Sequence, residues 1–235
     1  MTFWQWKAWV TPEKVKAHWA WYERGKQGEG RLVVEGRDLR GIERIRALDG
    51  ARFVRCDLSH AQLPSSLLDE IELVECNLDD STFSWSSMQR AQFDHSTFRR
   101  ANFAFAKLNG AFVEGGSFAQ MNAEKSTWYS VQARGADFRG ARLSMARLND
   151  AIFEDCDFRD AQLVRSDPEA DGGTAWSARF INCDFTGADV TGWLLRATRF
   201  EGCKLAGSRG KPSIGEPLVL RGNDLSEVQL NARWR

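Results

Sequence analysis

Large apolar residues recur at every fifth position of this chain, and this period limits the possible folds more than any other feature of the sequence. From Leu48 to Leu163 all 24 positions of the series are apolar, although apolar residues make up only 43% of the 235 residues. For a fixed phase, chance would give such a run on the order of once in a billion. After an interruption the series resumes in a shifted phase. Its later members are Phe180, Phe185, Val190, Leu195, Phe200 and Leu205, followed by Leu220, Leu225 and Leu230.

Small residues lie two positions before the large ones. Of the 23 such positions from Ala51 to Ala161, 20 hold Ala, Ser, Cys or Gly. Five residues advance an α-helix by about 500°, which gives no apolar stripe, and a strand alternates with a period of two. A coil with flat sides fits the pattern, because each unit can form one side with its large residue inward and its small residue where the wall turns. Stacked coils would then pair about 4.8 Å apart, as neighbouring strands do.

The repeating unit resembles that of the pentapeptide repeat family, which reads Ala, then Asp or Asn, then Leu or Phe, and two variable residues. Close copies are Ala136–Gly140, Cys156–Asp160 and Cys183–Gly187. The resemblance covers about three quarters of the chain. It implies an all-β solenoid, a right-handed quadrilateral β-helix of pentapeptide repeats with about twenty residues per coil.

The ends of a solenoid need caps, and the N-terminal residues predict one. Thr11, Pro12 and Glu13 are typical of a helix start, because they provide an N-cap hydroxyl, a proline at the first position and an acid near the positive end of the dipole. Gly25 is a plausible stop. The residues expected to form the packing face of this short capping helix are Val15, His18, Trp19 and Tyr22.

We expect four segments. Residues 1–47 hold an aromatic stretch with Trp4, Trp6 and Trp9, the capping helix, and a strand from Leu32 to Leu39 that leads into the repeats; Ile42 to Ala47 fit no pattern. The other three segments are the repeat solenoid at 48–163, an insertion loop at 164–179, and a continued solenoid at 180–235, with a second loop at 207–217 and a C-terminal cap. The tail at 231–235 could instead pair with another copy of the chain and form a homodimer.

No catalytic, metal-binding or cofactor-binding motif is found in the sequence. All five cysteines (Cys56, Cys76, Cys156, Cys183 and Cys203) fall on the small inward position and are interpreted as buried apolar residues. Cys56 and Cys76, like Cys183 and Cys203, are twenty residues apart, so each pair should stack on adjacent coils, where a disulfide is not excluded by distance. His18, His60 and His95 lack metal-ligand spacing and are expected to be solvated. We expect no enzyme and no cofactor.

With the interior filled, function should lie on the outside. Residues twenty apart form a ladder along the solenoid, and one outward ladder reads Ser65, Trp85, Phe105, Lys125, Met145 and Arg165. Tryptophan, methionine and arginine are enriched at interfaces, so this ladder is a candidate partner-binding surface. Alternatively, the insertion loop or the N-terminal segment covers Trp85 and Phe105. Phe112 and Ile152 are outward apolar residues on another ladder.

A second candidate surface is acidic. Between residues 69 and 80 no Lys or Arg occurs, and the acidic residues there are Asp69, Glu70, Glu72, Glu75, Asp79 and Asp80. The alternative is an ordinary solvated face. The whole chain is balanced, with 32 basic and 32 acidic residues, which argues against direct binding of nucleic acid.

These features favour a non-enzymatic protein-binding solenoid, most concretely a bacterial immunity-type or inhibitor protein that neutralises a toxin or an enzyme by surface contact. The alternative, which the family resemblance suggests, is a DNA-mimicking protein that binds and protects DNA gyrase, as in quinolone resistance. A purely structural spacer is a third possibility. The sequence has no apolar run long enough to span a bilayer and no signal peptide pattern, so we expect a cytoplasmic protein that does not bind membranes.

Overall fold

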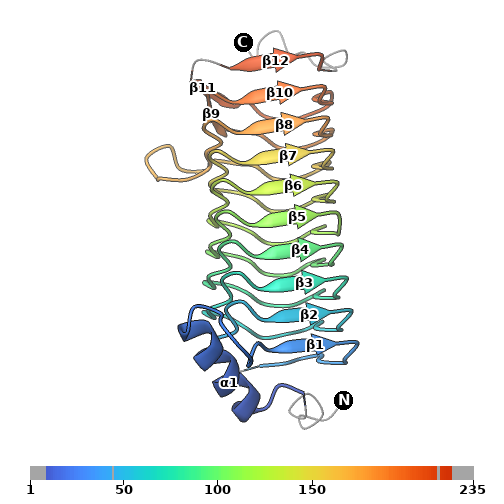
Figure 1. Cartoon of the computed structure of the whole chain (residues 1–235). Helices are drawn as coiled ribbons and strands as arrows, with labels where there is room; N and C mark the ends of the chain where they lie inside the picture. Colours follow the sequence, from blue (N-terminus) through green and yellow to red (C-terminus); the bar gives the residue numbers. More distant parts are fainter. Residues whose placement is uncertain (1–8, 44, 216–217, 224–235) are drawn as a thin grey trace.

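The computed structural model shows a four-sided coil whose turns stack into an elongated parallel β-solenoid (Figure 1). The structure describes residues 9–43, 45–215 and 218–223. Its elements are α1 (Pro12–Glu23), β1 (Val33–Glu35), β2 (Arg52–Val54), β3 (Glu72–Val74), β4 (Gln92–Asp94), β5 (Phe112–Glu114), β6 (Gln132–Arg134), β7 (Ile152–Glu154), β8 (Arg179–Ile181), β9 (Leu194–Arg196), β10 (Arg199–Glu201), β11 (Ser213–Gly215) and β12 (Val219–Arg221).

One side of the coil carries a ten-stranded parallel sheet, and we call it side 1. Its strand order is β1-β2-β3-β4-β5-β6-β7-β8-β10-β12, and from β2 to β7 each residue pairs with the residue twenty positions further on. In the coil that contains β4, sides 2, 3 and 4 follow side 1 in chain order and are centred on Phe98, Phe103 and Leu108. Each of these sides pairs with the same side of the neighbouring coils through isolated parallel bridges. On side 4, β9 and β11 also pair as strands. The predicted all-β solenoid with a short N-terminal helix is confirmed.

The large residues of the period fill the interior. Phe98, Phe118, Phe138 and Phe158 are buried and stack ring on ring, with successive centroids 4.8, 5.1 and 4.9 Å apart. This spacing equals the distance between neighbouring strands, because each ring comes from a successive coil. The small residues pack inside the wall, and all five cysteines are buried and free.

Most of the described corners of the coil turn through a left-handed residue, which the sequence analysis did not foresee. Among the described residues, 22 other than glycine have positive φ, and all but Lys26 lie two positions after an inward centre. This conformation is costly for β-branched side chains. Accordingly, none of the 22 is Val, Ile or Thr. The missing β-branched residues are therefore a sequence signal for these corners.

The repeats begin earlier than the predicted boundary at residue 48. β1 pairs with β2 in a register of 19 residues, and the described residues 32–43 and 45–47 belong to a first coil. Ile42 and Ile45, which fitted no sequence pattern, are both buried in the core.

The two predicted interruptions differ in structure. The first leaves the coil as a projecting loop near β7 and β8 (Figure 1), but Thr174 already pairs with Arg147 and the coil has resumed there. The prediction of a second loop at 207–217 is wrong for the described residues 207–215, because Arg209 pairs with Asp189 and β11 pairs with β9. Residues 207–215 thus continue the coil, with Pro212 and the glycines at positions that the coil accepts. Trp4, Trp6, Leu225, Leu230 and the tail at 231–235 lie outside the described residues.

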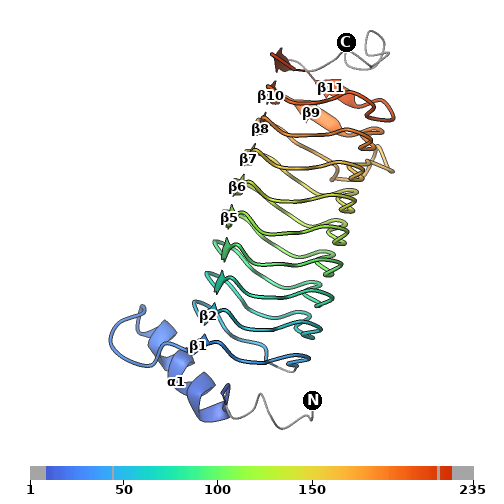
Figure 2. The ribbon, with the colours of Figure 1, turned by 90° about the vertical axis from the view of Figure 1, so that its right-hand side faces the viewer.

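Helix α1 lies against the first coils at the N-terminal end (Figure 2). Its start is as predicted, since the Thr11 side chain accepts a hydrogen bond from the Lys14 backbone N–H at 3.3 Å. The predicted face is partly wrong: Trp21 is buried and Trp19 is exposed. Trp21 lies three residues after His18 and so shares its face.

His18 holds this helix to the first coil, and the expectation that it is solvated is wrong. Its ring is buried, lies 5.3 Å from that of Trp21, and accepts a hydrogen bond from the Leu32 backbone N–H on Nδ1 at 3.0 Å. Burial lowers the pKa of His18, and the nearby Arg31 adds to this effect. The neutral ring is therefore the form that the cap requires.

We expect the protein to lose stability as the pH falls below about 6.5, the ordinary pKa of histidine. Above that pH the ring is neutral in both states, whereas below it the unfolded chain takes up the proton first, until the pH reaches the lowered pKa of the folded state. Urea midpoints measured from pH 7.5 to 5 should fall more steeply for the wild type than for His18→Gln. Parallel pH profiles for the two proteins would contradict this role.

Candidate functional site

An exposed aromatic stack stands at the corner between sides 3 and 4. The rings of Trp85 and Phe105 lie parallel, with centroids 4.1 Å apart and an interplanar angle of 4°, and the Lys125 ammonium lies 5.5 Å from the Phe105 centroid. We call these three residues the aromatic corner. Trp85 is 63% exposed, the most exposed of the large apolar residues described. The loop and the N-terminal helix therefore leave Trp85 open.

The fold itself does not require aromatic rings at this corner. Trp85 and Phe105 have φ of 63° and 61°, the left-handed conformation that costs a residue with a Cβ about 1–2 kcal/mol. The equivalent corners elsewhere are mostly glycine or polar residues. Since the left-handed backbone is common to most corners, what sets this corner apart is its two bulky rings, with most of the Trp85 ring in solvent, and this points to a role other than folding.

Apolar residues extend the aromatic corner toward the N-terminal end. Leu67 is 48% exposed, and its register partner on the next coil is Ser87, two residues after Trp85. Pro64 is also exposed and lies on the coil below Trp85. The apolar surface thus spans three successive coils, from Pro64 to Phe105.

The prediction that Met145 belongs to this surface is wrong, because Met145 is only 5% exposed. The insertion loop covers it: a Cβ on Gly172 would lie 2.6 Å from the Met145 carbonyl oxygen. The loop is tied down by Arg165, which donates to the Pro168 and Ala170 carbonyls, and by Arg147, which pairs with Asp171 at 2.8 Å. The exposed ladder therefore ends at Lys125.

The acidic run from Asp69 to Asp80 forms no single patch. Five residues make one side, so this run crosses side 1 and reaches sides 4 and 2. Glu70 pairs with Arg90 at 2.7 Å and with Lys26, and Asp80 pairs with Arg100 at 2.6 Å.

The other acidic residues of the run are also mostly engaged. Glu72 pairs with both Arg31 and Arg52; burial alone would raise its pKa, but these hydrogen bonds hold the pKa below its ordinary value. Asp69 accepts hydrogen bonds from Ser87 and Gln89, and the Asp79 side chain accepts one from the Arg99 backbone N–H. Glu75 is exposed. Three carboxylates of the run, those of Glu70, Glu72 and Asp80, are thus paired with basic side chains that are distant in sequence.

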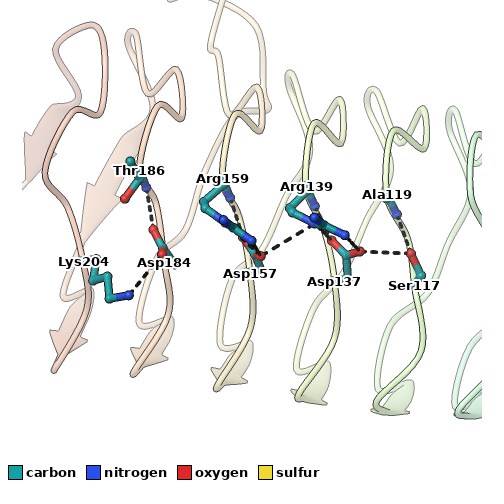
Figure 3. A network of polar contacts seen from close by, with 9 residues as sticks. All are labelled: Ser117, Ala119, Asp137, Arg139, Asp157, Arg159, Asp184, Thr186 and Lys204. Carbon is teal, nitrogen blue, oxygen red and sulfur yellow. Dashed lines mark hydrogen bonds and ion pairs between the residues drawn. The ribbon is translucent and has the colours of Figure 1, made fainter.

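Side 2 carries a ladder of charged residues that stabilises the coil (Figure 3). Asp137 and Asp157 each accept a hydrogen bond from the backbone N–H two residues later, at 3.0 Å, and each binds the arginine there. Arg139 also approaches Asp157 on the next coil, at 3.7 Å. The aspartate of the repeating unit thus closes a turn, which explains its position before the centre.

Side 1 has a shallow groove, about 510 Å³ in volume, over β4 to β7. Its walls include Phe112, which is 50% exposed, Ile152 and Arg134. Glu154 pairs with Arg134 across adjacent strands at 3.3 Å. The groove is open, and it contains no cluster of catalytic groups.

The described residues contain no group of three or more His, Cys, Asp or Glu side chains that could hold a metal ion. Within the same residues, no helix has the length and apolar character needed to cross a membrane. His60 and His95 are exposed, as expected, and His95 pairs with Asp94.

We expect all five thiols to be unreactive in the native protein. The Cys56 backbone N–H points to the Cys76 sulfur at 3.4 Å, so this pair stacks as predicted, and all five thiols are at most 2% exposed, out of reach of a reagent in the folded protein. Ellman's reagent should react with none of the five within minutes, and with all five in guanidinium chloride. Rapid reaction of the folded protein would contradict their burial.

A coil of five-residue sides, each with a large inward centre and some with a capping aspartate or asparagine before it, is the geometry expected of pentapeptide repeats. The family model for pentapeptide repeats matches eight copies, in residues 76–115 and 134–167. These residues are therefore pentapeptide repeats.

Several solved structures have a similar course. HetL, a pentapeptide repeat protein involved in heterocyst differentiation regulation from Nostoc sp. strain PCC 7120, is 20% identical, with 88% of this chain and 92% of HetL covered and a TM-score of 0.49. QnrB1, a plasmid-mediated fluoroquinolone resistance protein, is 17% identical, with 82% and 88% covered and a TM-score of 0.42. Rfr23 from Cyanothece 51142 is 14% identical, with 55% and 89% covered and a TM-score of 0.41. No curated protein matches the sequence. Sequence identities and TM-scores this low support no conclusion about function.

Proposed function

We propose that this protein is a non-catalytic binding protein that presents the aromatic corner to a protein target. The observation that carries the proposal is the Trp85–Phe105 stack, in which Trp85 is largely exposed and which the corners at Ser65, Lys125 and Met145 of the same ladder lack. Exposed tryptophan with flanking apolar residues and a nearby cation is the composition of interface hot spots. The rigid solenoid holds these rings in place before binding, which lowers the entropy lost on association.

The concrete form that we favour is an immunity-type or inhibitor protein that neutralises a toxin or an enzyme by direct contact. Such a role needs a rigid surface and no chemistry of its own. The absence of a metal cluster among the described residues and the lack of a catalytic motif in the sequence agree with it.

The alternative, protection of DNA gyrase through imitation of DNA, gains no support from the charges. A DNA mimic needs rows of unpaired carboxylates at phosphate-like spacing. Here Glu70, Glu72 and Asp80 are paired with arginine, and the acidic run is spread over three sides. A gyrase supercoiling assay with and without fluoroquinolone tests the alternative, and we expect neither inhibition nor protection at micromolar protein.

Affinity capture with three immobilised forms tests the proposal. The forms are the wild type, Trp85→Ala with Phe105→Ala, and Phe112→Ala, which removes a comparably exposed aromatic ring from side 1. Mass spectrometry should find a protein that the wild type and Phe112→Ala retain and that the double variant loses. A protein retained equally by all three forms would place the contact elsewhere.

A further inference from the structure

We propose that the open face of Trp85, above Ser65, is a stacking site for one aromatic side chain of the target protein. This inference rests on the proposed function and makes it more specific. It arises from the difference between the two faces of the Trp85 ring.

The ladder position next to Trp85 on its N-terminal side carries no ring. Phe105 covers one face of the indole at 4.1 Å. On the other side the next rung is Ser65, which is exposed and has the same left-handed backbone, with φ of 54° against 63° at Trp85. Its side chain is too short to cover an indole ring. A ring above Ser65 would therefore meet Trp85 much as Phe105 does.

The space beside Ser65 continues into a depression. Its neighbours Pro64 and Ser66 line a hollow of about 510 Å³ together with Gln62, Ile45 and Arg46. Leu67, on the same coil, adds exposed apolar surface. A side chain that stacks on Trp85 thus has room for the backbone that carries it.

The surroundings give a guanidinium group no advantage over an aromatic ring as the occupant. Lys125 already covers the far end of the stack, and the depression is lined by one cation, the exposed Arg46, and one anion, Glu43. A ring can stack on the open face of the indole as Phe105 does on the other face, and it loses less hydration than a cation would. Stacking of this kind changes affinity by about 3- to 10-fold beyond simple burial.

A titration with small probes tests the site without knowledge of the target. The probes are N-acetylphenylalaninamide, N-acetylleucinamide and N-acetylargininamide, and the signal is the Trp85 indole N–H resonance, assigned with Trp85→Phe. We expect a saturable shift with the phenylalanine probe below about 50 mM and about 3- to 10-fold weaker binding of the other two probes. No saturable shift, or an equal shift with the leucine or arginine probe, would overturn the proposal.

The substitution Ser65→Trp places an aromatic ring of the chain itself next to the open face of Trp85, and Ser65→Ala is the matched control. Trp85 shows that this type of corner accepts tryptophan, so the variant should fold with an unchanged circular dichroism spectrum. We expect Ser65→Trp to abolish the shift and Ser65→Ala to keep it; a shift that persists in Ser65→Trp contradicts the site.

The same variant separates this inference from the proposed function once a target is in hand. If Trp85→Ala with Phe105→Ala and Ser65→Trp both weaken binding, both proposals hold. If only the double variant weakens binding, the aromatic corner is the contact surface and the open rung is not used. If neither weakens binding, the proposed function itself fails.

Discussion

Phe118→Ala is expected to lower the free energy of unfolding by about 3–5 kcal/mol. Phe118 is fully buried and stacks between Phe98 and Phe138, at 4.8 and 5.1 Å, in the middle of the aromatic column. Its removal leaves a void that neighbouring coils cannot close, because every coil is held to the next by backbone hydrogen bonds. The loss of this one side chain should therefore weaken the packing of at least three coils.

Phe112→Ala is the matched control, since it removes the same side chain six residues earlier on the outside of the solenoid. Urea unfolding followed by circular dichroism should show a change within about 0.5 kcal/mol for this variant. A loss below about 1 kcal/mol for Phe118→Ala would show that the column is not packed as described.

Trp85→Ala combined with Phe105→Ala should weaken the complex with the target by about 30-fold or more, equivalent to about 2 kcal/mol. The pair loses its stacked apolar surface, while the corner keeps its backbone hydrogen bonds from the amides of both residues. Because alanine tolerates the left-handed corner no worse than tryptophan, stability should change little.

Titration calorimetry with the captured target measures this loss, and Phe112→Ala should bind within about twofold of the wild type. Equal affinity of the double variant and the wild type would exclude the aromatic corner as the contact surface. A double variant that fails to fold would be recognised from its circular dichroism spectrum, and each single variant would then replace it.

Most of the fold could be predicted from the sequence, because the inward centres recur at a period that only a flat-sided coil can satisfy. The buried cysteines and phenylalanine columns follow from the same period. The left-handed corners were missed because the repeat pattern shows which positions hold large or small residues. It does not show which residue types are absent from the corners. The first coil was missed because its 19-residue register breaks the period at Ile42 to Ala47.

The candidate site could be predicted only in part. Periodicity placed Trp85, Phe105 and Lys125 on one ladder, and the structure brings them into contact. It could not show that the insertion loop folds back over Met145, because loop docking depends on contacts such as that of Arg147 with Asp171. Nor could it show that arginines of neighbouring coils pair with Glu70 and Asp80 of the acidic run, since such pairs join residues twenty positions apart.

Hydroxyl-radical footprinting of the protein, free and bound to its captured target, tests most directly whether the aromatic corner meets the partner. Trp85 and Phe112 are both at least half exposed and lie on different faces of the solenoid, so each reports on its own surface. We expect oxidation of Trp85 to fall several-fold in the complex while oxidation of Phe112 stays the same. Protection of Phe112 with unchanged oxidation of Trp85 would contradict the account.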